Sequence, residues 1–190
     1  MFTDSLPKTE RLRAEYQRSD QLRSLELPAD DRLRMPASSV EEALKMEQSA
    51  PVRKASLDFL AAAAAFYSVS RPQGRVLAAR PLRVREDGWA TELFGDYHPE
   101  KKLIRVWMRT AVQKHVTAFG TFFATLCHEF CHHLDCERFR FQYTPHTRGF
   151  YERTAALYHH ARGTPPKCLF WTPLPHGRWR IDWPRTNRCG

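Results

Sequence analysis

The sequence predicts an α+β domain, in which a helix carrying the pattern H-E-x-x-H packs with further helices and a small antiparallel sheet. Three observations predict this fold. Residues 118–134 have the periodicity of an amphipathic helix, and the apolar run at residues 59–67 indicates a core helix that begins at Ser56. Residues 90–98 and 102–108 alternate around a turn and indicate two strands of a hairpin.

Residues 118–134 place aromatic and small polar side chains on opposite sides of one helix. At about 100° per residue, the two sets of side chains separate cleanly. The large apolar side, which we interpret as core, consists of Phe119, Phe122, Phe123, Leu126, Phe130 and Leu134. The opposite side consists of Ala118, Thr121, Thr125, His128 and His132. The two histidines therefore share a face on which small side chains leave room for an ion and a substrate.

The residue types within H-E-x-x-H indicate a catalytic metal. His128 and His132 lie four residues apart, so both imidazoles can face one ion. Glu129 lies about 100° around the helix and can reach a water on that ion without being a ligand. Zinc with an open coordination position lowers the pKa of its bound water to about 7. The pattern therefore predicts a site that hydrolyses peptide bonds.

A catalytic zinc usually takes three protein ligands, so a third ligand is expected further along the chain. Pro145 and Gly149 mark a loop or a helix entry, and the pattern becomes helical from Tyr151 onward. His146 lies in this loop, and Glu152 lies twenty residues after the second histidine of the motif. Spacing favours His146 and leaves Glu152 as the alternative.

The second predicted strand, residues 102–108, has two unlike faces. Successive side chains of a strand point to opposite sides, so one face is apolar and the other is mixed. The apolar face carries Ile104, Val106 and Met108, and the mixed face carries Leu103, Arg105 and Trp107. This pattern predicts a strand with one face on the core. An extended peptide substrate can add to the edge of such a sheet.

Residues 56–160 resemble the SprT-like zinc metallopeptidases, the group that includes the Spartan-type DNA–protein crosslink proteases. The order matches: a helix, a small antiparallel sheet, the H-E-x-x-H helix, and then H-x-x-x-F from His146 to Phe150. The resemblance implies a zincin-like fold and DNA-associated proteins as a substrate class. It also implies zinc bound by His128, His132 and His146, with Glu129 as the general base.

Composition divides the chain into three segments. Residues 1–50 are polar with charges of both signs, and we expect a mobile or loosely docked segment. Within it, Ser39 to Glu42 resembles a capping box for a short helix that ends near Glu47. Residues 51–162 would form the metallopeptidase domain, and residues 163–190 a basic, aromatic-rich tail.

The tail interleaves aromatic side chains with arginines. The C-terminal part of the chain to which this tail belongs, residues 137–190, carries 10 basic and 3 acidic side chains. Arginine binds phosphate and tryptophan stacks on bases, so single-stranded nucleic acid is a candidate partner. The composition favours, over such binding, a tail that packs its tryptophans on the domain and exposes its arginines for solubility. The alternation at residues 178–183 would also suit an edge strand. The candidate nucleic-acid contacts are Arg178, Trp179, Arg180, Trp183, Arg185 and Arg188.

The remaining features indicate a cytoplasmic protein. The first sixteen residues are charged and lack the apolar core of a secretory signal. The longest apolar run, residues 59–67, is too short to span a bilayer. Five cysteines, an odd number, favour reduced thiols. We therefore expect a cytoplasmic zinc endopeptidase. The first alternative is a catalytically idle, metal-stabilised module that binds nucleic acid, and the second is a zinc hydrolase that acts on something other than peptides.

Overall fold

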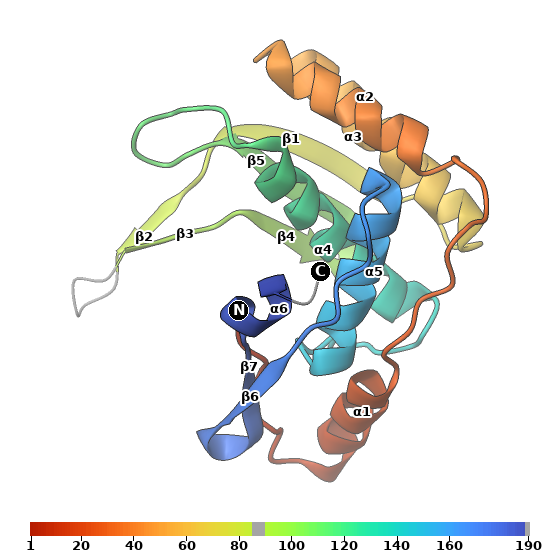
Figure 1. Cartoon of the computed structure of the whole chain (residues 1–190), viewed down its shortest axis with the longest axis vertical. Coiled ribbons are helices and arrows are strands. Elements are labelled where there is room, and N and C mark those ends of the chain that lie inside the picture. Colours follow the sequence, from red (N-terminus) through yellow and green to blue (C-terminus); the bar gives the residue numbers. More distant parts are fainter. Residues whose placement is uncertain (85–89, 189–190) are drawn as a thin grey trace. The chain divides into compact units, whose positions relative to one another are not determined.

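A computed structural model describes residues 1–84 and 90–188, which form an α+β structure with six α-helices (Figure 1). By its internal contacts the chain divides into two compact units. The first consists of Pro28–Leu134, and the second combines Met1–Leu27 with Asp135–Gly190. The boundary falls inside helix α4 (Phe119–Glu137), which therefore contributes residues to both units. Among the described residues, no helix is long and apolar enough to cross a membrane.

The unit of residues 28–134 contains two packed helices and a three-stranded sheet. Helices α2 (Arg34–Lys45) and α3 (Ser49–Phe66) lie side by side (Figure 1). The sheet has the order β1 (Gln73–Ala79), β5 (Leu103–Arg109), β4 (Gly95–His98). Strand β1 pairs with β5 in parallel, and β4 pairs with β5 in antiparallel orientation. The α+β class is thus confirmed, but the expectation of a purely antiparallel sheet was wrong.

The predicted strand at residues 90–98 is divided between two sheets. Its first part is β3 (Ala90–Glu92), which pairs with β2 (Leu82–Val84) as a separate two-stranded ribbon. Its second part is β4, which joins β5 across the short 3₁₀ turn η1 (Pro99–Lys101). The turn between β4 and β5 agrees with the sequence pattern. The division does not, because alternation predicts strands but not which partner each one pairs with.

Strand β5 is the central strand of its sheet, and this changes the expected burial of its two faces. The apolar face of Ile104, Val106 and Met108 is buried, as expected. Leu103 and Trp107 on the other face are also buried. The expectation of a single covered face was therefore wrong, and of the three residues predicted for the second face only Arg105 remains partly exposed.

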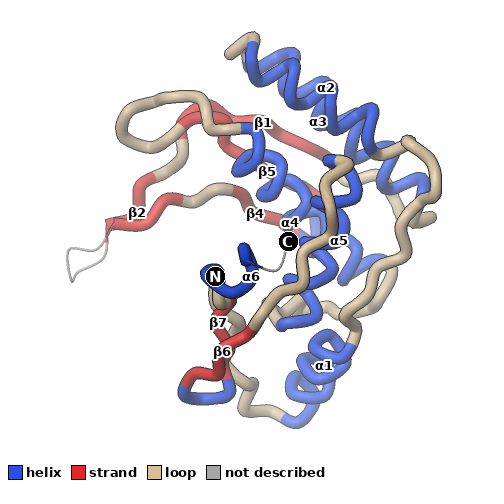
Figure 2. Tube along the Cα trace, in the orientation of Figure 1, coloured by secondary structure: helices blue, strands red, loops and turns tan. Residues whose placement is uncertain are grey.

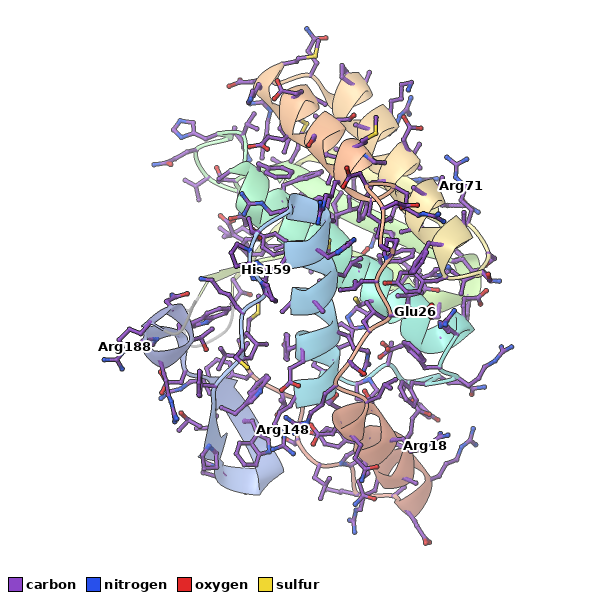
Figure 3. All side chains as sticks on the ribbon, turned by 45° about the vertical axis from the view of Figure 1, so that its right-hand side comes forward. Arg18, Glu26, Arg71, Arg148, His159 and Arg188 are labelled. Atoms are coloured by element: carbon purple, nitrogen blue, oxygen red, sulfur yellow. The ribbon has the colours of Figure 1, made fainter. Side chains whose placement is uncertain are left out.

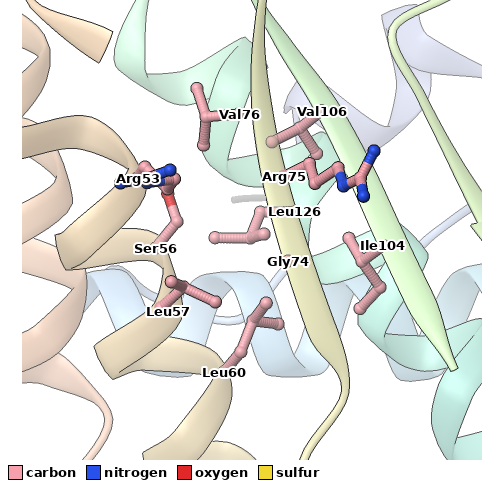
Figure 4. A pocket seen from close by; sticks show the side chains of 10 residues that line it. All are labelled: Arg53, Ser56, Leu57, Leu60, Gly74, Arg75, Val76, Ile104, Val106 and Leu126. Atoms are coloured by element: carbon pink, nitrogen blue, oxygen red, sulfur yellow. The ribbon is translucent and has the colours of Figure 1, made fainter. Parts of the chain in front are cut away.

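The core of this unit lies where α3 meets the sheet. The ring of Phe59 packs edge-on against Phe123 of α4, with ring centroids 4.8 Å apart. Figure 4 shows the neighbouring region, where leucines of α3 face the sheet across a cavity of about 10 Å³. A water molecule needs roughly that volume, so the interface is closely packed. Gly74 of β1 permits this approach, because a Cβ there would lie 2.9 Å from Leu57.

The N-terminal part of this unit differs from the expected short capped helix. Helix α2 begins at Arg34, so Ser39 lies inside it and donates its hydroxyl to the carbonyl of Met35. The capping box at residues 39–42 was therefore a wrong assignment. The reason is that apolar positions before Ser39, such as Leu33 and Ala37, are buried and extend the helix toward its N-terminus.

The second unit brings together two distant parts of the chain (Figure 2). Helix α1 (Glu10–Gln21) packs on α5 (Arg148–Arg162). The C-terminal residues form a hairpin of β6 (Trp171–Leu174) and β7 (Arg178–Ile181), connected by the short turn η2 (Pro175–Gly177) and followed by α6 (Trp183–Arg188). The strand suggested by the alternation at residues 178–183 is thus present as far as Ile181, after which the chain turns into a helix.

Buried polar contacts occupy the centre of this unit. Arg153 of α5 is fully buried and donates to the carboxylate of Asp135 at 2.7 Å and to the carbonyl of Ser19 at 3.1 Å. The Ser19 hydroxyl lies 3.0 Å from that of Thr147. Between the same two helices, Arg148, labelled in Figure 3, forms a partly buried ion pair with Asp20. Residues 1–27 therefore make many specific polar contacts with α5.

Candidate metal centre

Helix α4 places the two motif histidines together. The Nε2 atoms of His128 and His132 lie 3.1 Å apart, and the two rings meet edge to face. His132 is buried, whereas His128 is half-buried. Two nitrogens that are each about 2.0–2.1 Å from one tetrahedral ion would lie about 3.3 Å apart. The spacing of this pair therefore suits two ligands of a single metal ion.

The neighbouring His133 has a different role. Its Nε2 lies 2.7 Å from the carbonyl oxygen of Ser70, and its Nδ1 lies 2.9 Å from the hydroxyl of Tyr97. A carbonyl only accepts hydrogen bonds, so Nε2 carries the proton and Nδ1 of the neutral ring accepts from Tyr97. Both ring nitrogens are engaged, and His133 anchors α4 to β4 instead of binding a metal.

Glu129 lies beneath strand β4. Its side chain is buried, and a Cβ added to Gly95 would lie only 2.8 Å from its Oε1. A side chain at this point of the strand would therefore require Thr125 or Glu129 to move. Burial, and to a lesser extent the carboxylate of Asp96, raises the pKa of Glu129 to about 8. A carboxyl group with so high a pKa is typical of functional sites.

His146 precedes α5 on a loop with defined anchors. Thr147 is the N-cap of α5, and its hydroxyl accepts the N–H of Phe150 at 3.0 Å. A helix entry at this point agrees with the sequence pattern, but α5 begins at Arg148, before the expected start at Tyr151, and includes Gly149. The ring of His146 stacks on Tyr151 with centroids 5.8 Å apart, and the Nδ1 atom lies 3.5 Å from a carboxylate oxygen of Asp4.

Among residues 1–84 and 90–188, one group of metal-ligand side chains stands out. His128, His132 and His146 each offer one ring nitrogen, and these three atoms lie within 4.8 Å of one another. These three histidines could therefore hold a metal ion. Glu152, the alternative third ligand, is outside the group: its Oε1 accepts from Arg23 and from the indole of Trp171, both at 2.9 Å.

The cysteines near the motif are not part of this group. Cys127 and Cys131 are buried, and burial raises the pKa of the Cys127 thiol well above its ordinary value. Cys136 lies 3.7 Å from the carbonyl of Phe141. Buried thiols such as those of Cys127 and Cys131 pack as small hydrophobic side chains.

The candidate nucleic-acid residues fall on two elements of the C-terminal region. Arg178, Trp179 and Arg180 are on β7, and Trp183, Arg185 and Arg188 are on α6. All four arginines and Trp183 are exposed. Trp179 is half-buried, and the guanidinium carbon of Arg148 lies 4.3 Å from the centre of its ring. Nucleic-acid contact by these residues stays a prediction.

Four residues that the sequence reasoning did not single out lie around the site. Gly95 and Asp96 on β4 adjoin Glu129, His133 anchors α4, and Asp4 contacts His146. Of these four residues, only His133 could have been noticed in the sequence, because it directly follows His132. No family model, curated protein or solved structure matches this chain.

Proposed function

We propose that this chain is a zinc-dependent endopeptidase of the SprT-like type, with Glu129 as the general base. The observation that carries the proposal is the buried side chain of Glu129, which directly follows His128 in α4, together with the 3.1 Å between the Nε2 atoms of His128 and His132. A site with a purely structural metal needs no such carboxylate. DNA-associated proteins are the substrate class that the resemblance suggests.

The side chains have separate roles in the proposed reaction. His128, His132 and His146 would be the ligands of the zinc, which, when bound, lowers the pKa of its water to about 7. Glu129 would lose its own proton beside that cation, because a nearby positive charge favours the ionised carboxylate. Glu129 then takes one proton from the attacking water and passes it to the leaving amine nitrogen as the C–N bond breaks.

Strand β4 supplies a place for the substrate. It is the outer strand of the described sheet, and its Gly95 lies directly against Thr125 and Glu129 of α4. An extended peptide that pairs with the outer edge of this strand would run past the carboxylate. The absence of a side chain at Gly95 would let the scissile bond approach Glu129 closely.

The test combines metal analysis with cleavage of an unfolded protein such as casein. Wild type is expected to contain one zinc per chain, and His146→Ala to lose most of it. Glu129→Gln should fold and keep zinc, yet lose proteolysis by a factor on the order of 10² or more. Glu100→Gln, an exposed carboxylate in the η1 turn, is the matched control and should keep full activity.

Two results would contradict the proposal. Equal cleavage by wild type and Glu129→Gln would remove the enzymatic role. Full zinc content in His146→Ala, together with loss of zinc in Glu152→Ala, would show that the third ligand is wrong.

The second candidate is a catalytically idle, metal-stabilised nucleic-acid-binding module. The observation that favours it is the exposure of Arg178, Arg180, Arg185 and Arg188. Within the described part of the chain, none of these four forms an ion pair with an acidic side chain. Zinc binding without any Glu129-dependent cleavage, combined with binding of single-stranded DNA, would favour this candidate.

A further inference from the structure

Asp4 and His146 are 142 residues apart in the sequence, yet they form a reciprocal contact. We propose that Asp4 is a positioning residue of the metal centre, whose carboxylate fixes the ring of His146 so that its Nε2 serves as the ligand atom. This inference rests on the proposed function, since it assumes that His146 binds the metal.

The contact consists of three interactions. The backbone N–H of Asp4 donates to the carbonyl of His146 at 2.8 Å, and the backbone N–H of His146 donates to the Asp4 carboxylate at 2.8 Å. The same carboxylate oxygen, Oδ2, lies 3.5 Å from the ring nitrogen Nδ1. Backbone and side chain of the histidine are therefore both oriented by one residue.

The position of Asp4 is itself fixed by strand pairing. Residues 1–3 lie along β7, where the N–H of Ile181 donates to the carbonyl of Met1 and the N–H of Thr3 donates to the carbonyl of Trp179 at 2.9 Å. The N–H of Trp179 also donates to the Thr3 hydroxyl at 2.8 Å. This pairing brings the chain to His146 in one register, and a shift by one residue would turn the carboxylate away.

The chemistry of metal-bound histidine explains what the carboxylate would do. A histidine that binds a metal through one nitrogen usually donates its other N–H to a carboxylate or carbonyl, which fixes the tautomer and makes the ligand more basic. Asp4 faces Nδ1, and we assign Nε2, the nitrogen on the far side of the ring, to the metal. The rings of Phe150 and Tyr151 contact the same imidazole and limit its rotation.

The test compares neutral variants of Asp4 by metal affinity. In Asp4→Asn, the amide oxygen can still accept the N–H of His146, so the backbone contact is preserved while the charge is lost. Zinc affinity is measured by competition with a chelator, and ligand geometry by the visible absorption of the Co²⁺-loaded protein. We expect about 10–100-fold weaker zinc binding, an altered Co²⁺ spectrum, and an unchanged Tm of the metal-free protein.

Two further variants make the result interpretable. Asp30→Asn removes an exposed carboxylate that pairs with Arg32, and it should leave affinity and spectrum unchanged. Asp4→Ser is a second neutral variant, whose hydroxyl can still accept the backbone N–H of His146. Unfolding of both neutral variants would assign Asp4 a structural role and overturn the proposal.

The outcomes also separate this inference from the proposed function. A wild-type protein that binds no zinc contradicts the proposed function itself. A wild-type protein that binds zinc, together with unchanged affinity and Co²⁺ spectrum in Asp4→Asn, overturns only the inference about Asp4.

Discussion

In residues 28–134, the centre of the unit is made of apolar side chains such as Phe59, Leu60 and Phe123, all almost fully buried. In the unit of residues 1–27 and 135–190, the largest fully buried side chain is Arg153, paired with the equally buried Asp135. Apolar packing is nondirectional and tolerates several arrangements. A buried ion pair with hydrogen bonds tolerates only one, so it can fix how α1 and α5 meet.

The polar core has a clear geometric function. Arg153 donates to the carbonyls of Ser19 and Leu22 at the end of α1, and Thr144 donates to Asp135 at 3.2 Å. Burial raises the pKa of Asp135 to about 6, and Arg153 opposes that increase, so the carboxylate is ionised at pH 7. The pair therefore fixes the contact between α1 and α5. In the sequence, the loop that carries His146 connects Asp135 to α5, so both of its ends are held by this ion pair.

The largest effect is expected from breaking this pair on one side. Arg153→Met leaves the charge of Asp135 buried without compensation, which costs about 3–5 kcal/mol of unfolding free energy. Chemical denaturation of wild type and variant measures the loss. The matched control is Lys54→Met, which breaks an exposed pair with Asp58 and should cost about 0–1 kcal/mol.

A double variant sharpens the comparison. Arg153→Met combined with Asp135→Leu removes both charges, and we expect it to recover most of the lost stability. A loss for Arg153→Met no greater than that of the Lys54 control would show that the polar core contributes no more than a surface pair.

A smaller loss of stability is expected from a substitution in β4 of the other unit, at the point where this strand contacts α4. In Gly95→Ala, the new Cβ would lie 2.6 Å from the Cγ2 of Thr125 and close to Glu129. Overpacking of this kind costs about 1–3 kcal/mol. Thermal unfolding measures the loss, and cleavage assays should show reduced activity because Glu129 is displaced.

The Thr125→Ser background tests the cause, since it removes the methyl group that collides. Stability of Gly95→Ala should recover partly in that background, while activity should not. If Gly95→Ala were as stable and active as wild type, the close approach of β4 to Glu129 would have no functional importance.

The smallest effect on stability is expected in the C-terminal region, where Trp179 and Trp183 differ. Trp179 packs under Arg148, so Trp179→Ala should lower stability by about 0.5–1 kcal/mol from the cation–π contact alone. Trp183 is exposed, so Trp183→Ala should leave the Tm unchanged. If Trp183 stacks on a base, its removal weakens binding of single-stranded DNA by about 1–3 kcal/mol.

Salt dependence distinguishes phosphate contacts from stacking. Titration of a labelled oligonucleotide at two salt concentrations should give a slope of roughly −0.7 per phosphate neutralised. Substitution of Arg178, Arg180, Arg185 or Arg188 should reduce that slope, whereas Trp183→Ala should not. Absence of binding at low salt would contradict the nucleic-acid prediction.

Local patterns predicted the elements that carry the motif. The periodicity of residues 118–134 predicted the α4 helix and its apolar face, and Pro145 marked the loop before α5, whereas Gly149 lies inside that helix. These predictions succeed because helix periodicity and turn residues act over a few neighbouring residues. The same local reasoning failed for α2, where burial of Leu33 and Ala37 overrides the apparent cap at Ser39.

The sequence by itself determined the ligand types, their i, i+4 spacing and the neighbouring carboxylate, since one helix turn is enough to bring His128, Glu129 and His132 together. Only the tertiary structure decided that β1 joins the sheet in parallel, that Gly95 covers Glu129, and that Asp4 meets His146. These contacts join residues far apart in the chain. Their partners are selected by burial and by directional hydrogen bonds, for which a single sequence has no local signal.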